Sequence, residues 1–350
     1  MKRLIAIILC LAMILALTGC SGSKKTGTLT IYTWAGMFPD EVIDAFEEET
    51  GITVNYQNFD TDENMLMTLE ASKGADYDLV IADDYIIEQV ISEGLAQKLD
   101  TVKISNWDNI DSRFQGQFYD SKDEYTVPYG AGIMQIAYNP DKVDIDIKGY
   151  ADLFDDSLEG RVGVVGNNRV VTGLILKMLG YSMNTESEKE IREAGKKLIE
   201  LSPNINLIKD EYLNEDLLAG TIDVALLYQS QATLTAIDEN GANFKFVMPK
   251  EGLGFGVMGM FIPSQAANAD AAHKFIDYIL DGKVGASCFE WMGYCSTNSA
   301  ANQYISDDFK DLLTLPANLD TENAEIVQNI SAAAADVHEE IWNTFVNACK

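Results

Sequence analysis

Apolar and polar positions near the start of the chain follow a strand–helix–strand pattern. An apolar, β-branched run at residues 29–32 breaks at Trp34. Apolar residues then recur at roughly helical spacing over residues 42–50, and Gly51 ends that pattern. A second β-branched run follows at residues 53–56. The pattern predicts one strand–helix–strand unit with an aromatic residue at the end of its first strand.

The same alternation continues for most of the chain. Strands that alternate with helices favour a mostly parallel sheet with helices on both faces, and ligands of such sheets lie beyond the carboxyl ends of the strands. The pattern predicts strands at 78–82, 161–165 and 223–227, and helices at 62–71, 85–91, 170–179, 186–201, 229–238, 269–280, 284–292 and about 324–348.

Two glycine-rich breaks interrupt extended segments. The first, Gly130-Ala131-Gly132, lies inside an apolar stretch, and the second, residues 251–256, precedes another apolar run. Glycine permits a sharp bend, which suits a strand that crosses between two lobes. The breaks bracket a second α/β set, so we expect two lobes joined by two crossover strands around a hinged cleft. The predicted lobe boundaries are 28–131 plus 257–302 for the first lobe and 132–256 plus 303–350 for the second.

The first twenty residues form a separate segment. Lys2 and Arg3 precede an apolar run over 4–17 that is too short to span a membrane, which is typical of a secretory signal. The ending Leu17-Thr18-Gly19-Cys20 resembles the bacterial lipobox, in which the cysteine is lipidated and becomes the new N-terminus. An ordinary signal with an accidental cysteine is the alternative. We expect a signal peptide over 1–19 and a small, polar tether over 20–27.

Composition limits the partners of the exported chain. At 350 residues and 47% apolar content, the chain is long enough for two soluble domains. Its formal net charge of −30 should repel nucleic acid and anionic lipid. The acidity suits a cationic partner, although it also serves solubility alone.

Three cysteines remain after export and lipidation: Cys288, Cys295 and Cys349. They allow at most one disulfide and one free thiol. Cys288 and Cys295 are seven residues apart with no neighbouring histidine, so we expect buried thiols and no metal site.

The sequence lacks the common motifs of catalysis. It has no GxSxG, P-loop or HExxH motif and no GxGxxG after a strand. Its two histidines, His273 and His338, lie in helical patterns, where we expect surface or capping roles. We therefore expect neither an enzyme nor a bound cofactor. A secreted hydrolase on an α/β scaffold is the alternative, and it needs a base that neither histidine supplies.

Aromatic residues follow three of the predicted strands. Trp34 ends the first, Asp83-Asp84-Tyr85 follows the strand at 78–82, and Tyr228 follows the strand at 223–227. Aromatic rings attract a cation through their quadrupole, and carboxylates neutralise it. The alternatives are core packing for each ring and helix capping for the aspartates. Three strand ends of the same kind favour a cation-binding site.

Several short motifs along the chain match, in combination, those of one known family. Together they resemble the bacterial spermidine/putrescine-binding proteins, the solute receptors of polyamine ABC importers, from about residue 29 to the C-terminus. The resemblance implies a two-lobed type II periplasmic-binding fold that closes on its ligand. The motifs are Tyr32-Thr33-Trp34, residues 46–52, Tyr77-Asp78-Leu79-Val80, Val127-Pro128-Tyr129, Leu179-Gly180-Tyr181-Ser182, Pro249-Lys250-Glu251-Gly252 and Gly293-Tyr294.

The resemblance also implies a set of ligand-binding residues. Of the family's binding residues, this chain retains the tryptophan of the first strand, the tyrosine after the third strand and a polar residue just before that tyrosine. It also retains an aromatic residue in the second lobe and a late glutamine. An acid before the Gly-Tyr motif is present in some members. These positions are Trp34, Tyr85, Asp83, Tyr228, Gln328 and Glu290.

Several acids of the family pattern are replaced. Where the family has an acid in the second lobe's first strand–helix turn, this chain has Gly166-Asn167-Asn168. At the position of a second family acid it has Val170, and at that of the family's central aspartate it has Met258. Two hypotheses follow. The ligand is still a polyamine, and Asp83, Asp84 and Glu290 replace the missing acids. Alternatively, the scaffold binds a less cationic small solute whose polar end meets Asn167, Asn168 and Arg169; the asparagines also suit a simple turn.

We therefore expect a monomeric receptor that is anchored outside the cytoplasm by a lipid on Cys20. It would deliver a small amine to the permease of an ABC importer and bind no nucleic acid. A sensor that presents the closed lobes to a membrane receptor fits the same sequence.

Overall fold

The computed structural model describes residues 27–209, 212–241, 243–252, 254–313 and 324–349. The predicted signal peptide, Cys20 and all of the tether except its last residue lie outside these ranges. Within them, no helix is long and apolar enough to cross a membrane.

The first lobe begins with the predicted strand–helix–strand unit. Strand β1 pairs in parallel with β2 and β3, and its Leu29 and Ile31 are fully buried. Helix α2 follows Pro39 and ends at Gly51, whose φ of 71° is readily adopted by glycine. The elements are β1 (Gly27–Thr33), α2 (Asp40–Thr50), β2 (Ile52–Asn58), α3 (Asp62–Ser72), β3 (Leu79–Ala82), α4 (Asp84–Ser92), α9 (Ala269–Ile279), α10 (Gly282–Met292), β10 (Cys295–Ser296) and α11 (Asp307–Leu313).

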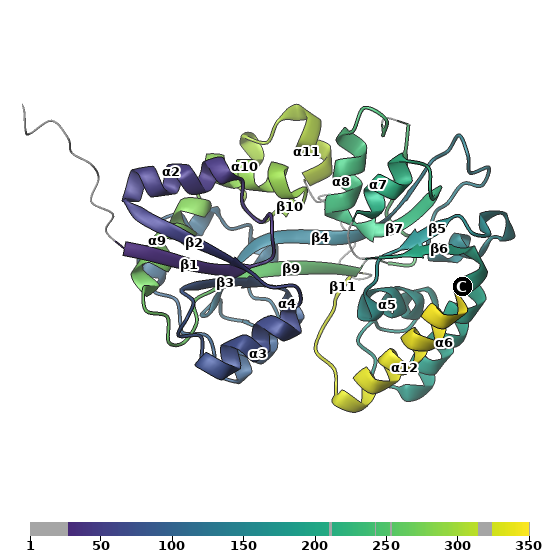
Figure 1. Ribbon diagram of the computed structural model, residues 1–350, viewed down its shortest axis with the longest axis horizontal. Helices are drawn as coiled ribbons and strands as arrows, with labels where there is room; N and C mark the ends of the chain where they lie inside the picture. The colour runs from purple at the N-terminus through teal and green to yellow at the C-terminus, as the bar shows by residue number, and fades with distance from the viewer. Residues whose placement is uncertain (1–26, 210–211, 242, 253, 314–323, 350) are drawn as a thin grey trace, which may run out of the picture.

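The second lobe repeats the α/β plan. Its strand β5 pairs in parallel with β6 and β7, and its helices cover the sheet on both faces (Figure 1). The elements are β5 (Val162–Val164), α5 (Asn168–Met178), α6 (Glu188–Leu201), β6 (Ile205–Ile208), α7 (Leu213–Leu218), β7 (Val224–Tyr228), α8 (Gln229–Ile237), β8 (Lys245–Val247), β11 (Glu325–Ile326) and α12 (Ala332–Ala348).

Two long strands, β4 (Thr126–Tyr138) and β9 (Gly254–Phe261), join the lobes. They pair antiparallel from Thr126↔Phe261 to Ile133↔Phe255, after which β4 pairs with β7 from Met134↔Tyr228 onward. The strand order β2-β1-β3-β9-β4-β7-β5-β6 therefore runs through both lobes, as the central strands of Figure 1 show. This arrangement is the two-lobed type II fold that we predicted.

The first glycine-rich segment does not interrupt its strand, contrary to our prediction. Strand β4 is continuous through Gly130 and Gly132, apart from a register shift between Pro128 and Gly130. A Cβ added to Gly132 would lie 2.7 Å from the ring of Tyr294, and one added to Gly130 would lie 2.8 Å from Cε of Met258. Gly132 is needed because the Tyr294 ring lies directly on the crossover strand, and Gly130 leaves room for the Met258 side chain. Likewise, Gly254 and Gly256 lie inside β9.

The C-terminal helix is shorter than predicted. Residues 325–326 form strand β11, parallel to β9, and helix α12 begins only at Ala332 after the Ser331 cap. Five short elements were not predicted, because their patterns are too brief to have a clear period: β6, α7, β8, β10 and α11.

Each lobe has its own hydrophobic core. The second-lobe core includes Val164, Leu174 and Leu226, whereas Ile305 and Leu313 pack in a first-lobe core. The chain after residue 302 therefore starts on the first lobe. The lobe boundaries themselves stay predictions.

Both histidines are buried, which corrects the expectation of surface or capping roles. His273 is 3% exposed, and its Nε2 accepts a hydrogen bond from the Asp100 backbone N–H at 2.9 Å. His338 is 0% exposed and lies inside α12. The sequence pattern of an amphipathic helix does not distinguish clearly between a histidine on its apolar face and one on its polar face, so the burial of these two side chains was not predicted.

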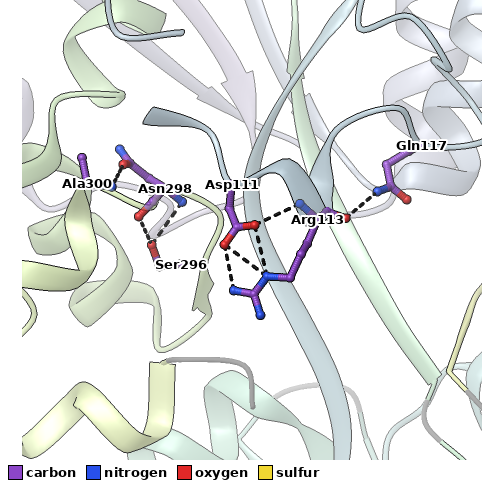
Figure 2. Close-up of polar contacts among 6 residues, drawn as sticks. All are labelled: Asp111, Arg113, Gln117, Ser296, Asn298 and Ala300. Atoms are coloured by element: carbon purple, nitrogen blue, oxygen red, sulfur yellow. Dashed lines mark hydrogen bonds and ion pairs between the residues drawn. The ribbon is translucent and has the colours of Figure 1, made fainter. Parts of the chain in front are cut away.

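The segment after β10 is fixed to the first lobe by a network of polar contacts (Figure 2). Asn298 Oδ1 accepts the backbone N–H of Ala300 at 2.9 Å, and Ser296 Oγ donates to the Asn298 carbonyl at 2.9 Å. Nearby, Asp111 pairs with Arg113 at 2.7 Å, and the Asp111 backbone N–H donates to the Thr297 carbonyl. These contacts position the chain from the end of β10 onward.

Replacing Gly132 tests whether Tyr294 needs this close approach. We expect Gly132→Ala to destabilise the protein by about 1–3 kcal/mol, because the new methyl group overlaps the tyrosine ring. Urea unfolding followed by circular dichroism measures the change. Gly256→Ala is the matched control, since Gly256 is the register partner of Gly132 and its added Cβ would meet only Asp84 Oδ2, at 3.7 Å. Equal losses in the two variants would contradict this explanation.

Candidate functional site

Four acidic or phenolic side chains converge where α3 and α4 begin. The Tyr85 hydroxyl lies 3.1 Å from Glu63 Oε1 and 3.3 Å from Asp62 Oδ2. The Asp83 backbone N–H donates to Asp62 Oδ1 at 3.4 Å, and the two carboxyl groups also hydrogen-bond to each other. We call Asp62, Glu63 and Asp83 the acid cluster. It follows the carboxyl ends of β2 and β3, where ligands of α/β sheets bind.

The acid cluster lacks a compensating cation in the described part of the chain. Burial raises the pKa of Asp83 to about 6, and burial together with the negative charge of Asp83 raises the pKa of Asp62 well above its usual range. No lysine or arginine is among the groups that act on either carboxyl. Buried carboxylates are normally paired or neutralised by a proton. This arrangement has a strong electrostatic preference for a bound cation.

Asp84 has a different role from Asp83. It is 2% exposed, and its Oδ2 accepts the backbone N–H of Val257 on the crossover strand β9 at 2.8 Å. Its Oδ1 accepts the backbone N–H of Tyr85 at 2.8 Å. Burial raises the pKa of this carboxyl as well, and the negative charge of Asp83 adds to the effect. Asp84 therefore connects α4 to the crossover, beside the acid cluster.

The predicted aromatic residues lie on both lobes. Trp34 and Tyr85 are half-buried and pack against the same first-lobe core, where the Trp34 ring lies 4.9 Å from that of Phe59. Tyr228 is the last residue of β7 and packs against the second-lobe core. All three occupy carboxyl ends of strands, as the sequence pattern predicted. That one ligand contacts all three rings stays a prediction.

The remaining predicted residues have structural partners. Asn167 caps α5 by accepting the Val170 backbone N–H at 3.1 Å. Glu290 Oε1 accepts the Ser306 backbone N–H at 2.6 Å, just before α11, and the structure gives no hydrogen bond between it and the acid cluster in the described residues. The backbone of Gln328 contacts Asn184 and Arg169. None of these contacts tests whether the side chains bind a ligand.

Asp62 and Glu63 are not among the residues that the sequence predicted for the site. The predicted helix at 62–71 begins with Asp62, and in the structure Thr61 caps this helix while both acids lie in the first turn of α3. The available signal was their position after β2, because the same strand-end rule that selected Asp83 applies to them. Tyr294, whose ring packs on the crossover strand, was not predicted as a site residue either.

A cavity of about 130 Å³ lies elsewhere between the lobes, and its lining includes Gln229 and Thr233 of α8, Met248, Cys295 and Asp311. Among the described residues that line it, Asp311 is the only carboxylate, and its side chain is exposed. We place the candidate site at the acid cluster because the uncompensated charge lies there.

No group of histidine, cysteine and acidic side chains among the described residues has the arrangement of a metal site. Cys288, Cys295 and Cys349 are free thiols. Burial raises the pKa of both Cys288 and Cys295 to about 12, so neither thiol is reactive at neutral pH.

The acid cluster should cost stability in the absence of ligand, and Asp83→Asn tests this cost. The folded state holds the Asp83 proton up to about pH 6, whereas the unfolded chain releases it near pH 4. Stability is therefore lost as the pH rises between these values. We expect Asp83→Asn to raise the unfolding free energy by about 1–2 kcal/mol at pH 7 and to leave it almost unchanged at pH 4.

Urea unfolding of the ligand-free protein at both pH values measures this effect. Glu70→Gln removes one charge from the exposed face of α3 and is the matched control. A gain that is the same at pH 4 and pH 7, or that also occurs in the control, would reject an electrostatic cost at Asp83.

Comparison with known proteins identifies the family. Residues 41–317 match the family described as bacterial extracellular solute-binding protein. The spermidine/putrescine-binding periplasmic protein of Escherichia coli K12 is 30% identical over 321 residues, which cover 91% of this chain and 92% of that protein.

Two solved structures share the fold. The spermidine/putrescine ABC transporter substrate-binding protein of Streptococcus pneumoniae superposes with a TM-score of 0.83 at 27% identity, over 93% of this chain and all of that one. A lipoprotein of Treponema pallidum gives a TM-score of 0.83 at 25% identity, over 91% and 99%. The chain thus belongs to the bacterial extracellular solute-binding proteins, among the substrate-binding proteins of polyamine ABC transporters, which bind their solutes and are not enzymes.

Proposed function

We propose that this protein captures a polyamine of the spermidine/putrescine kind outside the cytoplasm and delivers it to the permease of an ABC importer. The acid cluster is the observation that carries the proposal. Its carboxylates are arranged around the Tyr85 hydroxyl, and no basic side chain pairs with them in the described residues. A primary ammonium has three donors and one positive charge, which match this set of acceptors.

The ring faces give the ligand's hydrocarbon chain a surface. Trp34 and Tyr85 contribute from the first lobe, and we assign Tyr228 and Gln328 as the contacts from the second. Cation–π attraction adds to the binding when the ammonium lies near a ring. The names of relatives support the same ligand class, since those of Escherichia coli and Streptococcus pneumoniae refer to spermidine and putrescine.

A second candidate is a less cationic solute. Asn167, Val170 and Met258 replace acids of the family pattern, and their positions do not supply a substitute charge. The Asn167 side chain caps α5, and Met258 is 6% exposed within a first-lobe core. The negative charge found in the described site therefore lies on the first lobe only, at the acid cluster and Asp84.

Titration calorimetry with spermidine and putrescine tests the ligand class. We expect binding by the wild-type protein and a roughly 10- to 100-fold weaker affinity for Asp62→Asn, because one charge-assisted hydrogen bond is worth about 1.5–3 kcal/mol. Glu48→Gln, on the exposed face of α2, is a control for the change in net charge. If the wild-type protein shows no measurable binding to any amine in a panel, the proposed function is rejected. An equal loss of affinity in the Glu48→Gln control would reject the acid cluster as the binding site.

We also propose that a lipid on Cys20 anchors the protein to the membrane. The position lies outside the described residues, and the support is the lipobox-like sequence together with the relative that is named a lipoprotein. Cys20→Ala should move the protein from the membrane fraction to the soluble extracytoplasmic fraction in a producing bacterium. Retention in the membrane fraction would favour an anchor other than Cys20.

A further inference from the structure

Gln229 joins the second lobe to the crossover at the point where β4 changes its partner strand. It is the first residue of α8, directly after β7, and it is 3% exposed. Its Oε1 accepts the backbone N–H of Ile133 at 3.2 Å. Because Met134 pairs with Tyr228, the next pair of the ladder would be Ile133 with Gln229. The backbone turns into α8 there, so the Gln229 side chain supplies the acceptor that a further strand residue would have offered.

The same amide also binds the first lobe. Gln229 Nε2 donates to the carbonyl of Leu312 in α11 at 2.7 Å and contacts Sγ of Cys295 in β10. Helix α11 belongs to the first lobe, where the next residue, Leu313, is buried in the core. Helices α8 and α11 lie side by side in Figure 1. The orientation of the amide follows from its partners, because Ile133 offers a donor and Leu312 an acceptor.

Asp84 makes the corresponding contact on the other crossover strand. Strand β3 ends opposite Gly259 of β9, and two residues further on the same register would match Asp84 with Val257. The chain has already turned into α4 there, and the Asp84 carboxylate accepts the Val257 N–H at 2.8 Å. Each crossover strand is therefore held by the first residue of the helix that follows its neighbouring strand. These two residues adjoin Tyr85 and Tyr228, the rings assigned to the ligand.

One turn further along α8, Thr233 makes a second bond to the first lobe. Its Oγ1 donates to the carbonyl of Gly293 at 3.0 Å. Gly293 ends α10 with a φ of 71°, and a Cβ added to it would lie 3.1 Å from the carbonyl oxygen of Ser230. The first lobe therefore lies directly against the start of α8. Gln229 adds to this contact a bond to the crossover strand itself.

We propose that Gln229 is a positioning residue for polyamine binding, which acts by fixing Tyr228 relative to the first lobe. Tyr228 immediately precedes Gln229, and the acid cluster lies on the first lobe. The bonds of the amide to β4 and α11 therefore set the relation between the two halves of the site. Halves that are held in place lose less conformational entropy when a ligand binds between them. This role rests on the proposed polyamine receptor and needs no contact between Gln229 and the ligand.

Titration calorimetry of Gln229→Met with spermidine and with putrescine tests this role. Methionine is similar in length but cannot replace the hydrogen bonds of the amide. We expect binding of both ligands to weaken about tenfold and by the same factor, because the site is less ordered before either ligand binds. Thr233→Val is the matched control, since it removes the bond to Gly293 and leaves the crossover contact in place. Its affinities should change less than about threefold.

A double-mutant cycle shows whether Gln229 acts through the Tyr228 ring. Tyr228→Ala removes the ring, so the position of this residue then matters little to the ligand. We expect Gln229→Met to weaken binding by less than about threefold in the Tyr228→Ala background, against about tenfold in the wild-type protein. Losses that multiply across the two variants would show that Gln229 acts elsewhere and would overturn its positioning role.

Hydrogen exchange in the wild-type protein gives a measurement that needs no variant. A ligand that uses the arrangement held by Gln229 stabilises that arrangement in turn. Saturating spermidine should therefore slow exchange of the Ile133 N–H at least about tenfold, as resolved by nuclear magnetic resonance. Ala137, further along β4 and paired with Ala225 inside the second lobe, is the reference and should change less. An equal change at Ile133 and Ala137 would contradict the coupling.

The outcomes separate this role from the proposed function. If the wild-type protein binds a polyamine and Gln229→Met binds it equally well, the role of Gln229 is rejected and the receptor stands. Equal losses in Gln229→Met and Thr233→Val would also reject it, because any weakening of α8 against the first lobe would then suffice. If the wild-type protein binds no amine, the proposed function itself fails. If Gln229→Met does not fold, the exchange of the Ile133 N–H decides.

Discussion

The antiparallel pairing of β4 with β9 is the constraint on which the two-lobed arrangement depends. Strand β4 exchanges its partner within one step, since Ile133 faces Phe255 of β9 and Met134 faces Tyr228 of β7. The lobes are therefore parts of one continuous ladder, and any movement between them must be absorbed by a few residues at this exchange. Asp84 binds the β9 backbone next to this point, so the acid-bearing end of α4 is coupled to the crossover.

The distribution of charge follows from this geometry. Each lobe presents the ends of its own strands to the region between them, and the acid cluster lies at the strand ends of the first lobe. The carboxylates of the acid cluster have no basic partner among the described residues. Such groups are unfavourable in the empty protein, and a solute that pairs with them stabilises the bound state by the same interactions. Binding sites commonly retain this kind of local instability.

The sequence predicts the framework well because strand and helix periods, the helix-ending Gly51 and the residues after each strand are local signals. The sequence predicts the acid cluster only in part, because a pair of acids at the start of a helix occurs in two segments and only one of them belongs to the cluster. Asp40-Glu41 and Asp62-Glu63 both begin helices, yet the first pair is exposed, whereas Asp62 is 5% exposed and contacts Tyr85. Only the packing of α3 beside α4 separates the two cases. Gly132 of β4 likewise has a distant cause, the Tyr294 ring.

The free cysteines have a consequence for the life of an exported protein. Three thiols in an oxidising compartment invite wrong disulfides within and between chains. Cys288 and Cys295 are 0% exposed, and their raised pKa values leave almost no thiolate to attack a disulfide. Once folded, the chain is protected from thiol exchange at these two positions by its interior.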